Sequence, residues 1–215
     1  FAQLQLDRNQ WRRYLFSLTT PGENIPEEDL RTTSFALTAV SVEQNSDRQP
    51  VPYVIPPGVE RQVTPSGFGG GQTIQQDEQA LSLQVCGLKD GDARAVFKEQ
   101  RMDMRQFKTL RMFIHAESVP NQAQLRDGDL VAFIRIGSDF INNYYEYQIP
   151  LKITGPTTIR NSELIWPAGN KLELLMSKLV DLKTQRNAQN LPTYLPYRTV
   201  DELGNNIIVV GNPNF

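Results

Sequence analysis

Apolar and polar residues alternate in three successive runs between positions 108 and 151. Successive side chains of a strand point to opposite faces, so a period of two predicts half-buried strands. The polar loops SVPNQAQLRDG and SDFINN join the runs, and strands joined by short loops usually pair antiparallel. We therefore predict three strands of one antiparallel sheet. The side chains expected on its inner face are Leu110, Met112, Ile114, Ala116, Leu130, Ala132, Ile134, Ile136, Tyr145, Tyr147, Ile149 and Leu151.

Further strands are predicted on both sides of this region. Residues 34–42 are rich in β-branched and small side chains. Residues 80–86 alternate, with Leu81, Leu83 and Val85 expected to point inward. The other predicted strands are residues 93–97, 163–166 and 206–210.

The stretch 43–79 is rich in proline and glycine. Proline fixes φ and lacks an amide hydrogen, so PVPYVIPPG is predicted to be extended without sheet pairing. The cluster GFGGG has no following helix and no lysine close by, which a phosphate-binding loop would need. We expect a long surface loop in which residues 63–75 are mobile and dispensable for folding.

One helix is predicted over residues 170–185. Its apolar residues recur every three or four positions and form a single stripe. Asn170, followed three residues later by Glu173, matches a capping box. We expect the helix to lie on the core of the domain, with Leu175 and Leu179 buried.

Together these elements predict an all-β, mainly antiparallel fold: a jelly-roll-like β-sandwich with one packed amphipathic helix near residues 170–185. A chain of 215 residues is long enough for one such core. Residues 1–20 are expected to be an N-terminal strand segment or the tail of a preceding unit, and residues 21–215 the sandwich with its long loop at 43–79. Because the chain starts at Phe1 rather than methionine, we expect a piece of a longer protein with a truncated C-terminal end.

Charge and composition exclude several classes of protein. The formal net charge is −2, and the 22 lysines and arginines are scattered, so no basic surface for nucleic acid is predicted. No apolar run approaches the roughly 18 residues of a membrane-spanning helix. The single cysteine, Cys86, cannot form a disulfide within the chain.

Candidate catalytic residues are few. His115 is the only histidine, and no nucleophile or orienting acid accompanies it at a recognisable spacing. Cys86 has no neighbouring histidine or second cysteine, which favours a small packed residue over a reactive thiol. We therefore predict no enzyme activity, no cofactor and no catalytic metal.

The tripeptide Asp-Gly-Asp occurs twice and is the one notable acidic feature. Asp-Gly favours tight turns because glycine adopts positive φ. We therefore prefer to interpret both tripeptides as turns. The alternative is a calcium site, although two acids per turn fall short of the six to eight oxygens that Ca²⁺ takes. The weak calcium candidates are Asp90, Asp92, Asp127 and Asp129.

The predicted outer face of the central sheet carries more aromatic residues than a solvated face should. Either another part of the protein covers it, which is the commoner case, or it binds a partner. The candidate interaction face consists of Arg111, Phe113, His115, Phe133, Arg135, Tyr144 and Glu146, with Val131 in the same phase.

Several segments resemble the SprA/Sov family. They are PVPYVIPPGVER, QDEQALSLQVCGLKDGDARAVFK, MDMRQFKTL, TLRMFIHAE, DGDLVAFIRIGSDFINNYYEYQIPLKIT and WPAGNKLELLMSKLVDLKTQRN. The family forms the large outer-membrane translocon of the type 9 secretion system, which also serves gliding motility. The resemblance covers most of the chain in order, and its specificity comes from length because no single motif in it is catalytic.

This resemblance implies a non-catalytic structural and docking domain in the cell envelope, associated with the outer membrane. The partners it implies are other regions of the same translocon, accessory outer-membrane and plug proteins, and possible secreted cargo. The first alternative is a carbohydrate-binding module, which would need exposed aromatics, with Phe133, Tyr144 and Trp166 as candidates. The second is a polysaccharide-degrading jelly-roll enzyme, which would need a cleft with paired carboxylates or a metal.

Overall fold

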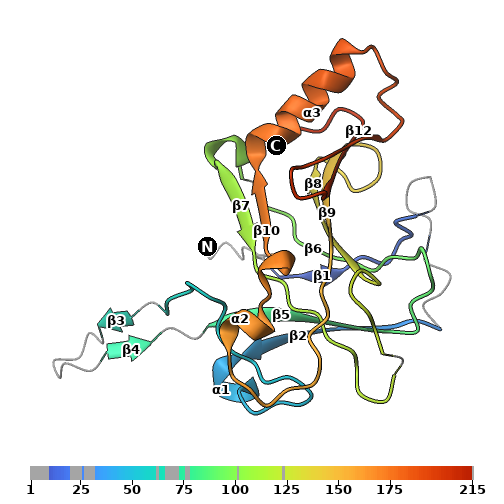
Figure 1. Ribbon diagram of the computed structural model, residues 1–215. Helices are drawn as coiled ribbons and strands as arrows, with labels where there is room; N and C mark the ends of the chain where they lie inside the picture. Colours follow the sequence, from blue (N-terminus) through green and yellow to red (C-terminus); the bar gives the residue numbers. More distant parts are fainter. Residues whose placement is uncertain are drawn as a thin grey trace, which may run out of the picture.

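Short antiparallel strands dominate the computed structural model, which confirms the all-β prediction (Figure 1). The structure describes residues 10–19, 26, 32–61, 63–65, 73–75, 78–100, 102–122 and 124–214, without the side chains of residues 63–65, 73–75 and 105. Across these residues there is one four-stranded sheet and there are four two-stranded sheets. The jelly-roll-like arrangement of the sheets stays a prediction.

The four-stranded sheet has the order β11-β12-β9-β8. Strands β8 (Val131–Gly137) and β9 (Tyr144–Pro150) pair antiparallel, as the alternation predicts. On the other side of β9 lies β12 (Asn206–Val210), and β11 (Tyr197–Val200) forms the edge. The sequence predicts the β8–β9 hairpin and the strand at 206–210 but not their assembly into one sheet.

Helix α3 (Met176–Ala188) packs on this sheet and closes the main core. Figure 1 shows it beside β12, at the end of the molecule where the chain terminates. The buried residues of this core are Ala116, Tyr145, Tyr147, Ile149, Leu151, Leu172, Leu174, Met176, Leu179, Leu182, Ile207 and Val209. As predicted, Tyr145, Tyr147 and Ile149 of β9, with Leu151 after it, point into this core. The predicted inner residues of β8 pack against it.

The first of the three central runs belongs to a different sheet from the one predicted. Strand β7 (Thr109–Met112) pairs with β10 (Leu172–Leu175) rather than with β8. Leu110 lies opposite Leu174 and packs against the main core, whereas Met112, expected inside, is exposed. The prediction of one three-stranded sheet is therefore wrong in its first strand.

The predicted helix starts six residues too early. Asn170 is buried at the end of a short 3₁₀ turn, η3 (Ala168–Asn170). Its side chain accepts from the backbone N of Lys152 at 2.7 Å and donates to the carbonyl of the same residue at 2.8 Å. Asn170 is therefore not a helix cap, and the next residues extend as β10. Leu175 ends that strand and is 39% exposed, whereas Leu179 is buried as predicted.

Residues 163–166, predicted as a strand, instead form most of helix α2 (Ser162–Ile165) and the residue after it. Asn161 is the N-cap, and its Oδ1 accepts from the backbone N of Glu163 at 2.8 Å and of Leu164 at 3.0 Å. This cap satisfies amides that have no partner within the helix, which favours a helical turn even in so short a segment.

Strands β2 (Ser34–Ser41) and β5 (Gln79–Cys86) form a ribbon paired along all eight positions. Both strands were predicted, but the predicted inward face of Leu81, Leu83 and Val85 is wrong for the two leucines. Ala80 packs against a second core, whereas Leu81 and Leu83 are exposed. Because neighbouring positions of a strand face opposite sides, covering the Ala80 face leaves these two leucines outside.

In the sequence, the proline-rich stretch connects β2 to β5. After helix α1 (Val42–Asn45), residues 46–61 form no strand, as predicted. Val51 and Tyr53 are nevertheless buried in the second core with Ile165 and Trp166, so this part of the stretch packs against the domain.

A two-stranded pair follows that stretch. Strands β3 (Val63–Pro65) and β4 (Thr73–Gln75) pair antiparallel, whereas the sequence predicts no strand there. The glycine cluster between them, with the rest of residues 66–72, lies outside the described residues, and the prediction of mobility stays untested.

The N-terminal segment also pairs with the body of the molecule. Strand β1 (Arg12–Arg13) pairs antiparallel with β6 (Val96–Phe97), and the backbone N of Tyr14 donates to Ala95 at 2.9 Å. A single 3₁₀ turn, η2 (Met104–Gln106), precedes β7.

Candidate functional site

Four residues of the candidate interaction face come together on the β8–β9 hairpin. Arg135 lies opposite Glu146, and its Nε donates to Oε2 at 2.6 Å. The two side chains are only 11% and 6% exposed. The Arg135 guanidinium carbon is 4.0 Å from the Tyr144 ring centroid and 5.7 Å from that of Phe133. A buried, hydrogen-bonded ion pair of this kind needs both partners, because either one alone would be an uncompensated charge.

This cluster continues into the turn between the two strands. Arg135 Nη1 also donates to the carbonyl of Phe140. Asp139 accepts from the backbone N of Ile141, Asn142 and Asn143, and these bonds outweigh burial and hold its pKa below the usual value. Its carboxylate therefore organises the turn.

Aromatic rings join this turn to the N-terminal segment. The Tyr14 ring packs edge-on against Phe16, Phe97 and Phe140 at centroid distances of 5.6–6.1 Å. Arg12 lies over Phe97 at 4.4 Å and pairs with the exposed Glu99. A hollow of about 600 Å³ opens beside these rings.

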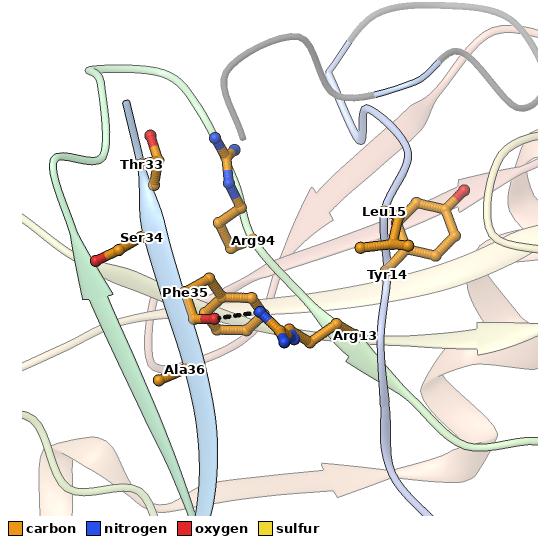
Figure 2. A pocket seen from close by; sticks show the side chains of 8 residues that line it. All are labelled: Arg13, Tyr14, Leu15, Thr33, Ser34, Phe35, Ala36 and Arg94. Carbon is orange, nitrogen blue, oxygen red and sulfur yellow. Dashed lines mark hydrogen bonds between the residues drawn. The ribbon is translucent and has the colours of Figure 1, made fainter. Parts of the chain in front are cut away.

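A smaller hollow of about 260 Å³ lies between the N-terminal segment and β2 (Figure 2). Figure 2 shows Arg13 crossing it, with Nη1 donating to the carbonyl of Phe35 at 2.8 Å. Arg94 reaches the hollow from the segment before β6 and pairs with Asp92 at 2.7 Å. Neither hollow was predicted from the sequence.

His115 lies in a second cluster, away from Arg135. Its Nδ1 is 2.7 Å from the carbonyl oxygen of Ile165, and its Nε2 is 3.1 Å from Oε2 of Glu117. Oε1 of Glu117 pairs with Arg48, which follows α1. Burial lowers the pKa of His115; the bond to Ile165 opposes this shift, and Arg48 adds to it.

Trp166 is the centre of this second cluster. Its ring packs edge-on against Tyr53, Phe113 and His115, with centroids 5.9–6.5 Å apart. Its Nε1 donates to the carbonyl of Val54 at 2.8 Å, and the side chain is buried. Trp166 therefore does not offer the exposed ring that a sugar-binding platform requires.

Arg111 stands apart from both clusters. It pairs with Glu173 of β10 at 2.8 Å, and its side chain is 65% exposed. Lys171 pairs with the same carboxylate and lies over the Phe113 ring at 6.0 Å. The candidate face thus divides into a group around Arg135, a group around Trp166, and Arg111; most of these side chains contact other parts of the chain.

The two Asp-Gly-Asp sequences form turns in which Gly91 and Gly128 adopt positive φ, as their sequence favours. Asp92 pairs with Arg94, Asp127 accepts from the backbone N of Ile153 at 2.8 Å, and Asp129 accepts from that of Arg126 at 2.7 Å. These carboxylates stabilise the turns and their neighbours.

Within the described part of the chain, no group of three or more His, Cys, Asp or Glu side chains is placed to hold a metal ion. Cys86 is a free, half-buried thiol at the end of β5. None of the helices in the described ranges is long and apolar enough to cross a membrane.

One hydrogen-bonded group was not predicted from the sequence: it links Tyr147 of β9 to the turn between β11 and β12. The Tyr147 hydroxyl donates to Asp201 Oδ2 at 2.6 Å and accepts from Asn205 Nδ2 at 2.9 Å. The sequence DELGN is a turn signal, but only the fold places it beside Tyr147. Exposed apolar residues lie in the loop before β11, at the end of β11 and in the turn after it: Leu191, Tyr194, Leu195, Val200 and Leu203.

Comparison with known proteins gives one informative result. A search of curated proteins finds no match. The SprA_N family, described as motility related/secretion protein, matches residues 1–215. The chain therefore belongs to the SprA_N family of motility related/secretion proteins.

Proposed function

We propose that this chain is a non-catalytic structural and docking domain of an outer-membrane translocon that exports proteins through the type 9 secretion system and supports gliding motility. The observation that carries the proposal is the family match over the whole length of the chain. The resemblance of its segments to the SprA/Sov family is the reason for proposing the type 9 secretion translocon in particular.

A docking domain needs an outward surface for its neighbours, and the end of the molecule near β11 offers one. Tyr194 and Leu203 are 76% and 81% exposed, and Leu195 and Val200 are also exposed. We call these four residues the β11 patch. Tyr194 and Leu195 precede β11, whereas Val200 ends it and Leu203 lies in the turn after it, so the four residues border this edge strand at both ends. Apolar residues exposed along one surface are typical of protein interaction sites. Its proposed partners are other regions of the same translocon and the accessory proteins of the outer membrane.

We also propose a structural role for the candidate interaction face. Phe140 in the β8–β9 turn joins the hairpin to Tyr14 of the N-terminal segment, and Arg135 bonds to the carbonyl of Phe140. Phe113 and His115, which follow β7, join that segment to α2 and to Trp166 after it. We propose that these contacts hold the domain rigid, and that Arg111 at the exposed end contacts a neighbouring region.

Site-specific cross-linking tests the proposal. A photo-reactive amino acid at position 194 of the full-length protein, in cells, should cross-link to another region of the translocon or to an outer-membrane partner, identified by mass spectrometry. The control position is Gln84, which is exposed on β5, a strand of a different sheet. Equal cross-linking at the two positions, or none at position 194, would contradict a docking role for the patch.

A further inference from the structure

The outer edge of β2 pairs with no strand in the described part of the chain. Neither SFALTAVS of β2 nor QALSLQVC of β5 contains a charged residue or a proline, and their register runs over eight positions without a bulge. Proteins usually protect an edge strand with such features or keep it short, because its free backbone groups attract another strand. The edge strand β11, by contrast, has four residues and carries Arg198. The β2 edge is therefore suited to pairing with an added strand.

Two hydrogen bonds show which residues of β2 direct their backbone groups outward. The backbone N of Ser41 donates at 3.0 Å to the side chain of the last residue of α1, so its hydrogen does not point at β5. The carbonyl of Phe35 accepts from Arg13 at 2.8 Å. In an antiparallel pair every second residue points both its N–H and its C=O away from the partner strand. Leu37 and Ala39 share this phase, and among the described residues their outward groups have no backbone partner.

An apolar strip runs along the same part of the ribbon. Leu37 and Ala39 lie opposite Leu83 and Leu81, two leucines that are 46% and 41% exposed. Directly opposite residues share a face, so these four side chains lie together. Thr38, between the first two, is exposed on the other face. A strand added beside β2 would widen the strip with alternate apolar side chains and place polar ones beside Thr38.

A cation lies at one end of this open edge. Arg13 is exposed and contacts no carboxylate of a described residue, whereas Arg12 and Arg94 each pair with an acid. Figure 2 shows Arg13 reaching from the N-terminal segment to the Phe35 carbonyl, across the hollow of about 260 Å³. A carboxylate on an added strand would supply the opposite charge at this end.

We propose that the outer edge of β2 binds an extended segment of a partner protein by strand addition, with an acidic residue of that segment beside Arg13. The segment runs antiparallel to β2, bonds to the outward groups of Leu37 and Ala39, and places alternate apolar side chains on the strip. The edge is separate from the β11 patch, so this site does not depend on docking there. Gln84, the control position for cross-linking, lies on β5, with β2 between it and the open edge.

Hydrogen exchange of the 1–215 chain, followed by NMR, tests the site with a synthetic peptide. The peptide is short, acetylated and amidated, alternates valine with threonine, and ends in glutamate. In the chain alone the amides of Leu37 and Ala39 should exchange fast, whereas that of Thr38, which points to β5, should be protected. At a peptide concentration of ten times Kd, exchange at Leu37 and Ala39 should slow about tenfold, because only the free edge exchanges.

Matched changes test the backbone bonds and the charge separately. Ala39→Pro removes an outward N–H without breaking the β2–β5 pairing and should weaken peptide binding about fivefold. Gln79→Pro, the same change at the start of β5, should leave binding unchanged. A peptide ending in glutamine should bind about threefold more weakly than the glutamate peptide. Arg13→Gln should abolish that difference, and this comparison holds even if Ala39→Pro does not fold.

Several results would overturn the proposal. Protection of Leu37 and Ala39 in the chain alone would mean that another segment or a second copy already covers the edge. Slowed exchange at Leu81 and Leu83 instead, on adding the peptide, would place the site on β5. Equal binding of the two peptides would remove the acidic residue from the partner, and no slowing with either peptide would remove the site.

Discussion

At the scale of single residues, Tyr147 and Asp201 give the sharpest example of a side-chain contact that holds two distant segments together. Burial raises the pKa of Tyr147, and its bond to Asp201 raises it further. Burial alone would raise the pKa of Asp201, but the bonds from Tyr147, Asn205 and Leu203 outweigh it and lower the pKa. The phenol and carboxylate therefore stay in the forms that bond to each other over the usual pH range.

We expect Tyr147→Phe to lower the free energy of unfolding by about 1.5 kcal/mol, the contribution of a hydrogen bond to a charged group. Urea unfolding measures the change. Tyr194→Phe is the matched control, because that hydroxyl belongs to an exposed side chain, and it should change stability by less than about 0.5 kcal/mol. Equal effects of the two substitutions would show that the Tyr147 hydroxyl bond is unimportant.

The same pair predicts a pH dependence. Because the pKa of Asp201 is lower in the folded than in the unfolded protein, its contribution is present above pH about 4 and lost as the pH falls through the folded pKa. Asp201→Asn should flatten this part of the stability curve, measured by urea unfolding between pH 2.5 and 6. An unchanged acid slope would contradict the assignment.

Substitutions at Gly128 and Gly155 distinguish the effect of backbone conformation on stability from the effect of steric clashes of an added side chain. A Cβ at either position would meet no heavy atom within 4 Å, but only Gly128 has a positive φ, of 87°. Gly128→Ala should therefore cost about 1–2 kcal/mol, the penalty of a left-handed backbone for a residue with a side chain. Gly155→Ala should be nearly neutral in thermal unfolding; a comparable loss there would reject the explanation.

At the scale of elements, the alternation of apolar and polar residues predicted β8, β9 and β5 because each has one face against a core. The β-branched and small side chains of residues 34–42 predicted β2. The alternation placed the first central run in the wrong sheet because pairing depends on distant residues. Leu110 and Leu174 face each other across a gap of more than sixty positions, and nothing local indicates this.

The error at residues 170–175 has a related cause. The sequence KLELLMSKL fits both a helical stripe and an alternating strand, and the short apolar run does not distinguish the two. Pairing with β7 selects the strand up to Leu175, and the helix begins where that pairing ends. Asn170, whose side chain suits a cap, bonds instead to the backbone of Lys152.

The buried stripe of α3 gives a test at this scale. Leu179→Ala should lower the free energy of unfolding by about 2–5 kcal/mol, because the side chain is 1% exposed in the main core. Val180→Ala, on the exposed side of the same helix, should cost less than about 0.5 kcal/mol. Similar losses for both, measured by urea unfolding, would mean that α3 does not pack on the sheet through Leu179.

At the scale of the whole molecule, the sequence predicted the all-β class, and its resemblance to SprA/Sov agrees with the family to which the chain belongs. The sequence did not predict that the candidate interaction face divides into a group around Arg135, a group around Trp166, and Arg111. Trp166 gathers Phe113 and His115 into a core with the proline-rich stretch, and this depends on a contact between residues 54 and 166. The exposed β11 patch likewise appears only once the edge of the sheet is known.

The most direct test of the central claim combines Tyr194→Ser and Leu203→Ser in the full-length protein and measures secreted cargo from living cells. Both side chains are exposed, so the 1–215 chain with these changes should unfold at the same urea concentration as the unmodified chain. A docking domain predicts that secretion nevertheless falls well below that of a control with Gln84→Ser. Unchanged secretion, with the full-length variant present at normal abundance, would contradict docking through the β11 patch.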